Sequence, residues 1–145
     1  IICIMFESCL AKQASIKSIF ENLTTPEQRY EKIIEFGRNL PKIHDQFKTP
    51  LNLVAGCQSQ TYLVASKEND RIFFEIGSDA LISAGLAALL LNVYNGETAE
   101  TILKCPPSFI DEIGVSASLS PSRANGLYSM HLRMKSEALK LLLAK

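Results

Sequence analysis

Hydrophobic residues at helical spacing predict two amphipathic helices in the first third of the chain. From Ser15, apolar side chains recur at the i, i+3, i+4 and i+7 positions of one helix face, namely Ile16, Ile19, Phe20 and Leu23. Thr25 then has the sequence of an N-cap, with Pro26 at the first helical position and Gln28 placed to close a capping box. Pro41 ends this second helix.

The centre of the chain has the pattern of β-strands. Alternating residues over 51–55 predict one strand, and the β-branched and aromatic runs 61–65 and 71–76 predict two more. The polar residues 67–70 between the last two runs predict a hairpin turn. Strands that are connected locally in this way favour an antiparallel sheet.

Helices return after the predicted sheet. Residues Ala80–Tyr94 are almost entirely apolar, which predicts a buried helix, and Ser78 or Asp79 is placed to cap it. A helix of about 15 residues reaches roughly 22 Å, which is short of the roughly 30 Å hydrocarbon layer of a membrane. Ser120 followed by Pro121 opens a long C-terminal helix. The order of helices, hairpin and helices predicts an α+β domain, with a small antiparallel sheet and helices packed on one of its faces.

Composition and charge narrow the functional classes. The chain has 145 residues, 47% of them hydrophobic, and a domain of this size builds a core without disulfides or a structural metal. Its 15 Lys and Arg residues balance 15 Asp and Glu residues, which argues against a nucleic-acid partner. The apolar start Ile1–Phe6 is too short for a signal-peptide core, so we expect a cytoplasmic protein with no membrane partner.

One of the four cysteines has a setting that favours exposure. The cysteines, Cys3, Cys9, Cys57 and Cys105, form no close pair of the kind that zinc or redox motifs need, so we expect no metal site. Gly56 precedes Cys57, and the polar residues Gln58, Ser59 and Gln60 follow it, which predicts a loop tip between apolar strands. A buried core thiol is the usual state of a free cysteine, and this alternative stands beside that of a reactive thiol.

A histidine beside Cys57 would make a cysteine-dependent hydrolase, and the chain has two candidates. His44 lies in a charged loop that is typical of a solvated histidine, and His131 lies near the packed face of the C-terminal helix. No local signature of a cysteine protease surrounds Cys57. A hydrolase is therefore the weaker hypothesis.

Arg123 stands in the first turn of the C-terminal helix, where the helix dipole disfavours a cation. It is either a solvated arginine or a group held there to pair with an anion. The seven glycines never fall in a dinucleotide-binding or P-loop spacing. The sequence therefore does not support a nucleotide site.

Five groups of residues, in register along the chain, match the pattern of a known protein family. The strongest match is the run G-C-Q-S-Q at 56–60, followed by an aromatic and apolar strand. The other matches are Tyr30 with 33–37 and 40–41, then 77–80, then Gly85, and finally 119–123 with Gly126 and Leu127. Together they span about residues 15–143 and resemble the SufE sulfur-acceptor proteins of iron–sulfur cluster assembly. Tyr62 stands where the family often has Trp, and the first dozen residues match nothing in the family.

The resemblance implies a SufE/IscU-like domain over residues 15–145, with residues 1–14 as a flexible N-terminal extension. It further implies that Cys57 takes a persulfide sulfur from a cysteine desulfurase, stimulates that enzyme, and passes the sulfur to an iron–sulfur scaffold complex. The desulfurase, not this chain, would hold pyridoxal phosphate. Residues implied to bind the partner or support the loop are Gly56, Gln58, Ser59, Gln60, Asp79 and Arg123.

Two hypotheses about function follow from this resemblance. The main one is a sulfur-transfer protein that works with a desulfurase, rather than a stand-alone enzyme, and the alternative is an interaction module that only activates the desulfurase. Arg123 either pairs with Asp79 inside the protein or contacts the desulfurase. We also expect Cys57 to be partly shielded at rest, with Leu53 and Tyr62 among the residues that cover it.

Overall fold

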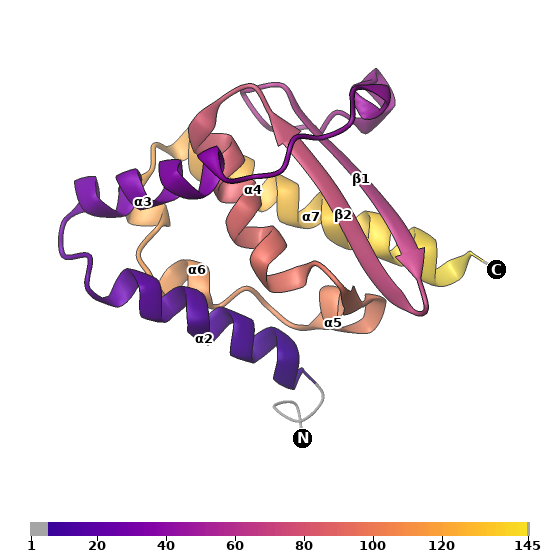
Figure 1. Ribbon diagram of the computed structural model, residues 1–145, viewed down its shortest axis with the longest axis horizontal. Helices are drawn as coiled ribbons and strands as arrows, with labels where there is room; N and C mark the ends of the chain where they lie inside the picture. The colour runs from indigo at the N-terminus through magenta and orange to yellow at the C-terminus, as the bar shows by residue number, and fades with distance from the viewer. Residues whose placement is uncertain (1–5, 145) are drawn as a thin grey trace.

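The computed structural model describes residues 6–144, in which helices surround one side of a β-hairpin (Figure 1). The helices and strands run, in chain order, as α2 Glu7–Glu21, α3 Pro26–Arg38, β1 Thr61–Glu68, β2 Arg71–Ser78, α4 Leu81–Tyr94, β3 Glu97–Thr98, α5 Ala99–Lys104, α6 Phe109–Glu112 and α7 Pro121–Leu143. Short 3₁₀ turns lie at η1 Asp45–Phe47, η2 Pro50–Asn52 and η3 Ser116–Ser118. The predicted α+β class is confirmed.

The sheet is antiparallel throughout and has the order β1-β2-β3. Asn69 and Asp70 alone connect β1 to β2, and both have positive φ, 50° and 68°, as the tight turn of a two-residue hairpin requires. On one face Leu63, Ile72 and other apolar side chains are buried against α4 and α7. Both helices therefore cover the same face of the sheet, as the sequence predicts (Figure 1).

The predicted strand over 51–55 is wrong. Pro50 starts the 3₁₀ turn η2 there, and only Leu53 makes a β-bridge, to Tyr62. The third strand of the sheet is instead β3, which pairs with the start of β2 through residues 97 and 98. A strand of two residues is too short for an alternating pattern, so hydropathy could not reveal it.

The first helix begins earlier than predicted. α2 starts at Glu7 and buries Cys9, Gln13, Ile16 and Phe20 along one face. Gln13 is polar and interrupts the apolar pattern, but its side-chain amide donates to the Pro106 carbonyl at 3.0 Å and its oxygen accepts from the Phe109 backbone N–H at 3.1 Å. The predicted boundary after residue 14 thus falls inside α2. Cys3 lies outside the described residues.

Two of the three predicted helix starts have the expected caps. Thr25 and Gln28 form the complete capping box of α3, and the Ser120 side chain accepts from the Arg123 backbone N–H at the start of α7. The predicted cap of α4 by Ser78 or Asp79 is wrong, because the N-cap is Ala80, which makes no side-chain bond. The Asp79 carboxylate accepts from the Gln60 backbone N–H instead.

Helix α4 is the central element of the core and packs against α2, α3, α7 and β2. Its contact with α3 is so close that backbone meets backbone. A Cβ atom at Gly85 would lie 2.0 Å from the Ile33 carbonyl oxygen, and one at Gly37 would lie 2.4 Å from the Leu81 carbonyl oxygen. Both glycines are therefore required for the crossing of the two helices. No helix between residues 6 and 144 is both long and apolar enough to cross a bilayer.

Replacing Gly85 with alanine should destabilise the protein. In an open helix this change stabilises by about 0.5–1 kcal/mol, but the added Cβ would overlap the Ile33 backbone, which costs about 1–3 kcal/mol or more. We expect a melting temperature several degrees lower for Gly85→Ala. Ser136→Ala, on the exposed side of α7, is the control. A Gly85→Ala protein that melted with or above the wild type would show that the two helices do not need this contact.

Candidate functional site

The loop that carries Cys57 turns directly against α7. Gly56 has φ +92°, a left-handed conformation that favours glycine. A Cβ atom at Gly56 would also lie 2.3 Å from the Ser129 Oγ of α7. Glycine therefore satisfies two requirements here, the turn itself and the close approach of the loop to the helix.

Arg133 of α7 fixes the segment that leads into this loop. Its guanidinium donates from Nη1 to the Leu53 carbonyl at 2.7 Å and from Nη2 to the Leu51 carbonyl at 2.9 Å. Nε of the same group donates to the Glu137 carboxylate at 3.2 Å. Arg133 was not predicted from the sequence, where the available signal was the i, i+3, i+7 spacing of Gly126, Ser129 and Arg133 along the helix.

The Cys57 thiol is half-buried at this contact. Its Sγ donates to the Gly126 carbonyl at 3.7 Å, and a Cβ atom at Gly126 would lie 3.8 Å from the sulfur. Burial raises the pKa of the Cys57 thiol, while a hydrogen bond with the Thr61 hydroxyl lowers it by a smaller amount. The resting group is therefore a neutral thiol at neutral pH. The backbone of α7 at Gly126 covers part of the thiol. Leu53 and Tyr62, which were expected to cover it, form a β-bridge with each other.

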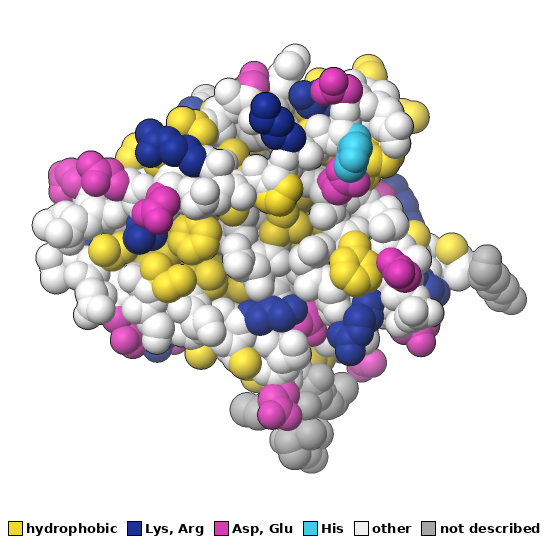
Figure 2. All heavy atoms as spheres, in the orientation of Figure 1, with side chains coloured by type: hydrophobic (Ala, Val, Ile, Leu, Met, Phe, Trp, Pro, Cys, Tyr) yellow, Lys and Arg dark blue, Asp and Glu magenta, His cyan; other side chains and the backbone are white. Residues whose placement is uncertain are grey.

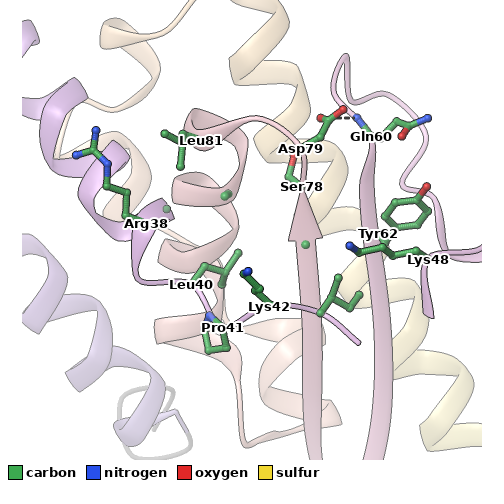
Figure 3. A pocket seen from close by; sticks show the side chains of 14 residues that line it. Arg38, Leu40, Pro41, Lys42, Lys48, Gln60, Tyr62, Ser78, Asp79 and Leu81 are labelled. Carbon is green, nitrogen blue, oxygen red and sulfur yellow. Dashed lines mark hydrogen bonds between the residues drawn. The ribbon is translucent and has the colours of Figure 1, made fainter. Parts of the chain in front are cut away.

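The residues after Cys57 are anchored to the start of α4 and the end of β2. Ser59 Oγ donates to Ser83 Oγ at 2.8 Å and accepts from Ser78 Oγ at 3.1 Å. The Gln60 backbone N–H donates to the Asp79 carboxylate at 3.0 Å (Figure 3). Three predicted site residues, Ser59, Gln60 and Asp79, thus hold the loop in place, whereas the Gln58 side chain is exposed.

Arg123 also reaches this anchor, but it does not pair with Asp79. Its Nη1 donates to Ser83 Oγ at 2.9 Å, and the Asp79 carboxylate is bonded to Gln60. The ion pairs found among residues 6–144 include none between Arg123 and Asp79. A contact between Arg123 and a desulfurase stays a prediction.

Neither histidine is paired with Cys57. His44 is exposed, and its Nδ1 lies 2.7 Å from the Glu75 carboxylate. The His131 ring stacks on Tyr94 with centroids 5.3 Å apart, and within the described chain its buried Nε2 has no hydrogen-bond partner. Burial, and secondly the charge of Lys135, lower the pKa of His131 to about 4. The arrangement that a hydrolase would need is therefore not formed.

A groove with basic side chains opens beside the Cys57 loop (Figure 3). It has a volume of about 620 Å³ and includes Gln60 and Asp79 of the loop anchor. Arg38, Lys42 and Lys48 line it, together with apolar side chains that include Leu40, Tyr62 and Leu81. We call this the basic groove. Hydrophobic side chains with Lys and Arg around them are visible on the same face in Figure 2.

The neutral, buried His131 should make stability depend on pH. The ring has a pKa of about 4 in the folded protein and about 6.5 when unfolded, so below pH 6.5 the unfolded chain binds the extra proton. The stability contributed by this residue therefore falls as the pH drops from about 6.5 to 4. His131→Phe, which keeps an aromatic ring on Tyr94, should show a smaller loss of melting temperature across this range. Identical pH slopes in both proteins would contradict the buried neutral state.

The chain is similar to known proteins over most of its length. The family model described as "SufE: Fe-S metabolism associated domain" matches residues 14–138. A SufE-like protein of Synechocystis, itself uncharacterized, is 37% identical over 126 residues, which cover 87% of this chain and 79% of that protein. The SufE-like protein 1, chloroplastic/mitochondrial, of Arabidopsis thaliana is 38% identical over 131 residues, 90% of this chain and 35% of that longer protein.

Two further comparisons concern a named protein and a fold. The sulfur acceptor protein CsdE of Escherichia coli is 34% identical over 118 residues, which cover 80% of each chain. The solution structure of a hypothetical protein from Thermus thermophilus superposes with a TM-score of 0.76, covering 92% of this chain and 97% of that one, at 24% identity. The likeness of structure shows the shared fold, and the family match with its relatives shows that the chain belongs to the SufE family.

Proposed function

We propose that this protein accepts a persulfide sulfur on Cys57 from a cysteine desulfurase and passes it to an iron–sulfur scaffold. The observation that carries the proposal is a half-buried thiol on a loop that is fixed on both sides, with no base beside it. A relative named as a sulfur acceptor protein supports it. Stimulation of the desulfurase and a cytoplasmic location are parts of the proposal that rest on the family resemblance.

The transfer step needs Cys57 as a thiolate, its proton having passed to solvent or to the active site of the desulfurase, and a correctly placed donor. The Cys57 thiolate attacks the terminal sulfur of the donor persulfide, and the bond between that sulfur and the donor cysteine breaks. The products are a persulfide anion on Cys57 and the restored donor thiol, which takes the proton of the terminal sulfur. No general acid or base from this chain is required, and the pyridoxal phosphate that generates the donor persulfide belongs to the desulfurase.

Partial burial of Cys57 suits a carrier of reactive sulfur. A persulfide that was fully exposed would lose its sulfur to thiols in solution, so cover from α7 protects it between encounters. The same burial raises the pKa of the thiol and slows its attack. Docking of the desulfurase must therefore expose or deprotonate Cys57, which makes transfer depend on the partner.

The basic groove gives such a partner a surface beside the loop. Arg38, Lys42 and Lys48 contribute three cations, although Lys48 lies 3.2 Å from the Asp45 carboxylate, and the carboxylate of Asp79 is already bonded to Gln60. The groove shares residues with the anchor of the Cys57 loop, so a segment bound there would lie next to the thiol. An acidic segment of the desulfurase is the occupant that this charge favours.

Replacing Cys57 with serine should abolish sulfur acceptance and leave the fold intact. After incubation with desulfurase and cysteine, we expect the wild-type chain to gain about 32 Da, the mass of one sulfur atom, and Cys57→Ser to gain none. Cys105→Ala, at a buried thiol of the core, is the control and should keep the gain. Sulfur on Cys57→Ser would show that another residue is the acceptor. A wild-type chain that stimulates the desulfurase but gains no mass would favour the pure interaction module.

Reversing one charge of the basic groove should weaken docking. For Lys42→Glu we expect a dissociation constant about three- to tenfold higher for the desulfurase, with a smaller difference at high salt because the contact is electrostatic. Lys67→Glu, near the opposite end of β1 from Cys57, is a matched control. Isothermal titration of both variants measures the effect. Equal affinities for Lys42→Glu and Lys67→Glu would remove the groove from the docking surface.

A further inference from the structure

Arg133 joins α7 to the segment that leads into Cys57. Its Nη1 and Nη2 donate to the carbonyls of Leu53 and Leu51 at 2.7 and 2.9 Å, and its Nε donates to the Glu137 carboxylate at 3.2 Å. The bond to Glu137 lies within α7, whereas the two carbonyls belong to residues 80 and 82 positions earlier in the chain. One guanidinium therefore ties two distant parts of the chain together.

The ion pair with Glu137 does not by itself require an arginine. Lys140 also lies 3.2 Å from the Glu137 carboxylate, so this acid has a second cation. A lysine at position 133 would give Glu137 the same i,i+4 pairing. A lysine has its donors on one atom, however, whereas the planar guanidinium spreads them over three nitrogens. The contacts with Leu51 and Leu53 are therefore what an arginine explains.

The segment that Arg133 holds has weak anchors of its own. Leu51 is 88% exposed and Leu53 is 36% exposed, so burial does little to fix either residue. Leu53 forms a β-bridge with Tyr62, which joins the segment to the sheet. The two bonds from Arg133 join it to the helix.

The contacts of the Cys57 loop with α7 follow one face of that helix. They are spaced i, i+3 and i+7 along it, and the chain meets them in reverse order: Leu53 at Arg133, Gly56 beside Ser129, and Cys57 at Gly126. Three residues separate Leu53 from Cys57. A Leu53 carbonyl that left α7 would therefore draw the thiol away from the Gly126 carbonyl that covers it.

We propose that Arg133 is a positioning residue for Cys57, whose two bonds to the carbonyls of Leu51 and Leu53 hold the loop on α7 and keep the thiol covered. It acts through the backbone of the loop and not on the sulfur. The far side of the loop is held separately, at Asp79 and the start of α4, so loss of Arg133 frees the near side alone. The use of this cover to retain a bound sulfur rests on the proposed function. The cover itself can be measured without a desulfurase.

The test is the pH profile of Cys57 alkylation by iodoacetamide, followed on the Cys57 peptide by mass spectrometry. Arg133→Met keeps a long side chain and removes all three donors. We expect alkylation about three- to tenfold faster than in the wild type, with its midpoint at lower pH, because a less buried thiol ionises more easily. Arg133→Lys keeps the charge but not the planar fork, so its rate should lie nearer to that of Arg133→Met.

Two controls separate a local release of the loop from a general loss of stability. Arg71→Met removes another arginine that donates to a backbone carbonyl, at 2.9 Å, near the hairpin turn at the opposite end of β1 from Cys57. It should keep the wild-type profile. The thiols of Cys9 and Cys105 are buried in the core, so their peptides report on opening of the whole protein in the same sample. They should react no faster in Arg133→Met than in the wild type.

Three results would overturn the proposal. One is a wild-type rate and midpoint in Arg133→Met, and another is a wild-type rate in Arg133→Lys. The third is an equal acceleration at Cys57, Cys9 and Cys105, because the arginine would then stabilise the fold as a whole. Faster alkylation of Cys57 alone, in a chain that accepts no sulfur from a desulfurase, would keep the positioning role and remove the proposed function.

Discussion

The contact between the Cys57 loop and α7 is the constraint on which the site depends. At Gly56 a φ of +92° favours glycine and a Cβ atom would overlap the Ser129 hydroxyl, and at Gly126 the helix carbonyl accepts a hydrogen bond from the Cys57 thiol. Arg133 holds the preceding carbonyls against the same helix. The loop therefore packs against α7 and does not project into solvent, which is why the thiol is half-buried.

The opposite side of the loop depends on the position of α4. Ser59 and Gln60 are bonded to Ser83 and Asp79, which stand at the start of α4 and just before it. That start is fixed in turn by the glycine contact between α3 and α4, where Gly37 meets the Leu81 carbonyl. The close helix crossing in the core and the geometry of the loop are thus linked through one element.

This arrangement protects Cys57 but also lowers the reactivity of its thiol. Cover from α7 shields a bound persulfide, and the accompanying loss of solvent raises the pKa of the thiol. Among residues 6–144, the hydrogen bond of the Cys57 sulfur goes to the Gly126 carbonyl and not to a cationic side chain. Under the proposed function, the activation of the neutral resting thiol comes from the docked desulfurase.

Local signals predicted what depends on neighbouring residues. The capping box at Thr25, the start of α7 at Ser120 and the hairpin all follow from residues a few positions apart, and so does Cys57 at a loop tip. The first two turns of α2 were not predicted because Gln13 interrupts the apolar pattern. Its side chain is buried through hydrogen bonds to partners more than 90 positions away. Arg133 and Ser83 were not predicted for a similar reason, since only the fold brings them to the loop.

The most direct test of the account follows labelled sulfur to its acceptor atom. The protein is incubated with a cysteine desulfurase and isotopically labelled cysteine, trapped by alkylation, digested, and sequenced by tandem mass spectrometry. We predict one labelled sulfur per chain, all of it on the Cys57 peptide. Label on the peptides of Cys3, Cys9 or Cys105, or a stimulated desulfurase with no labelled peptide, would contradict it.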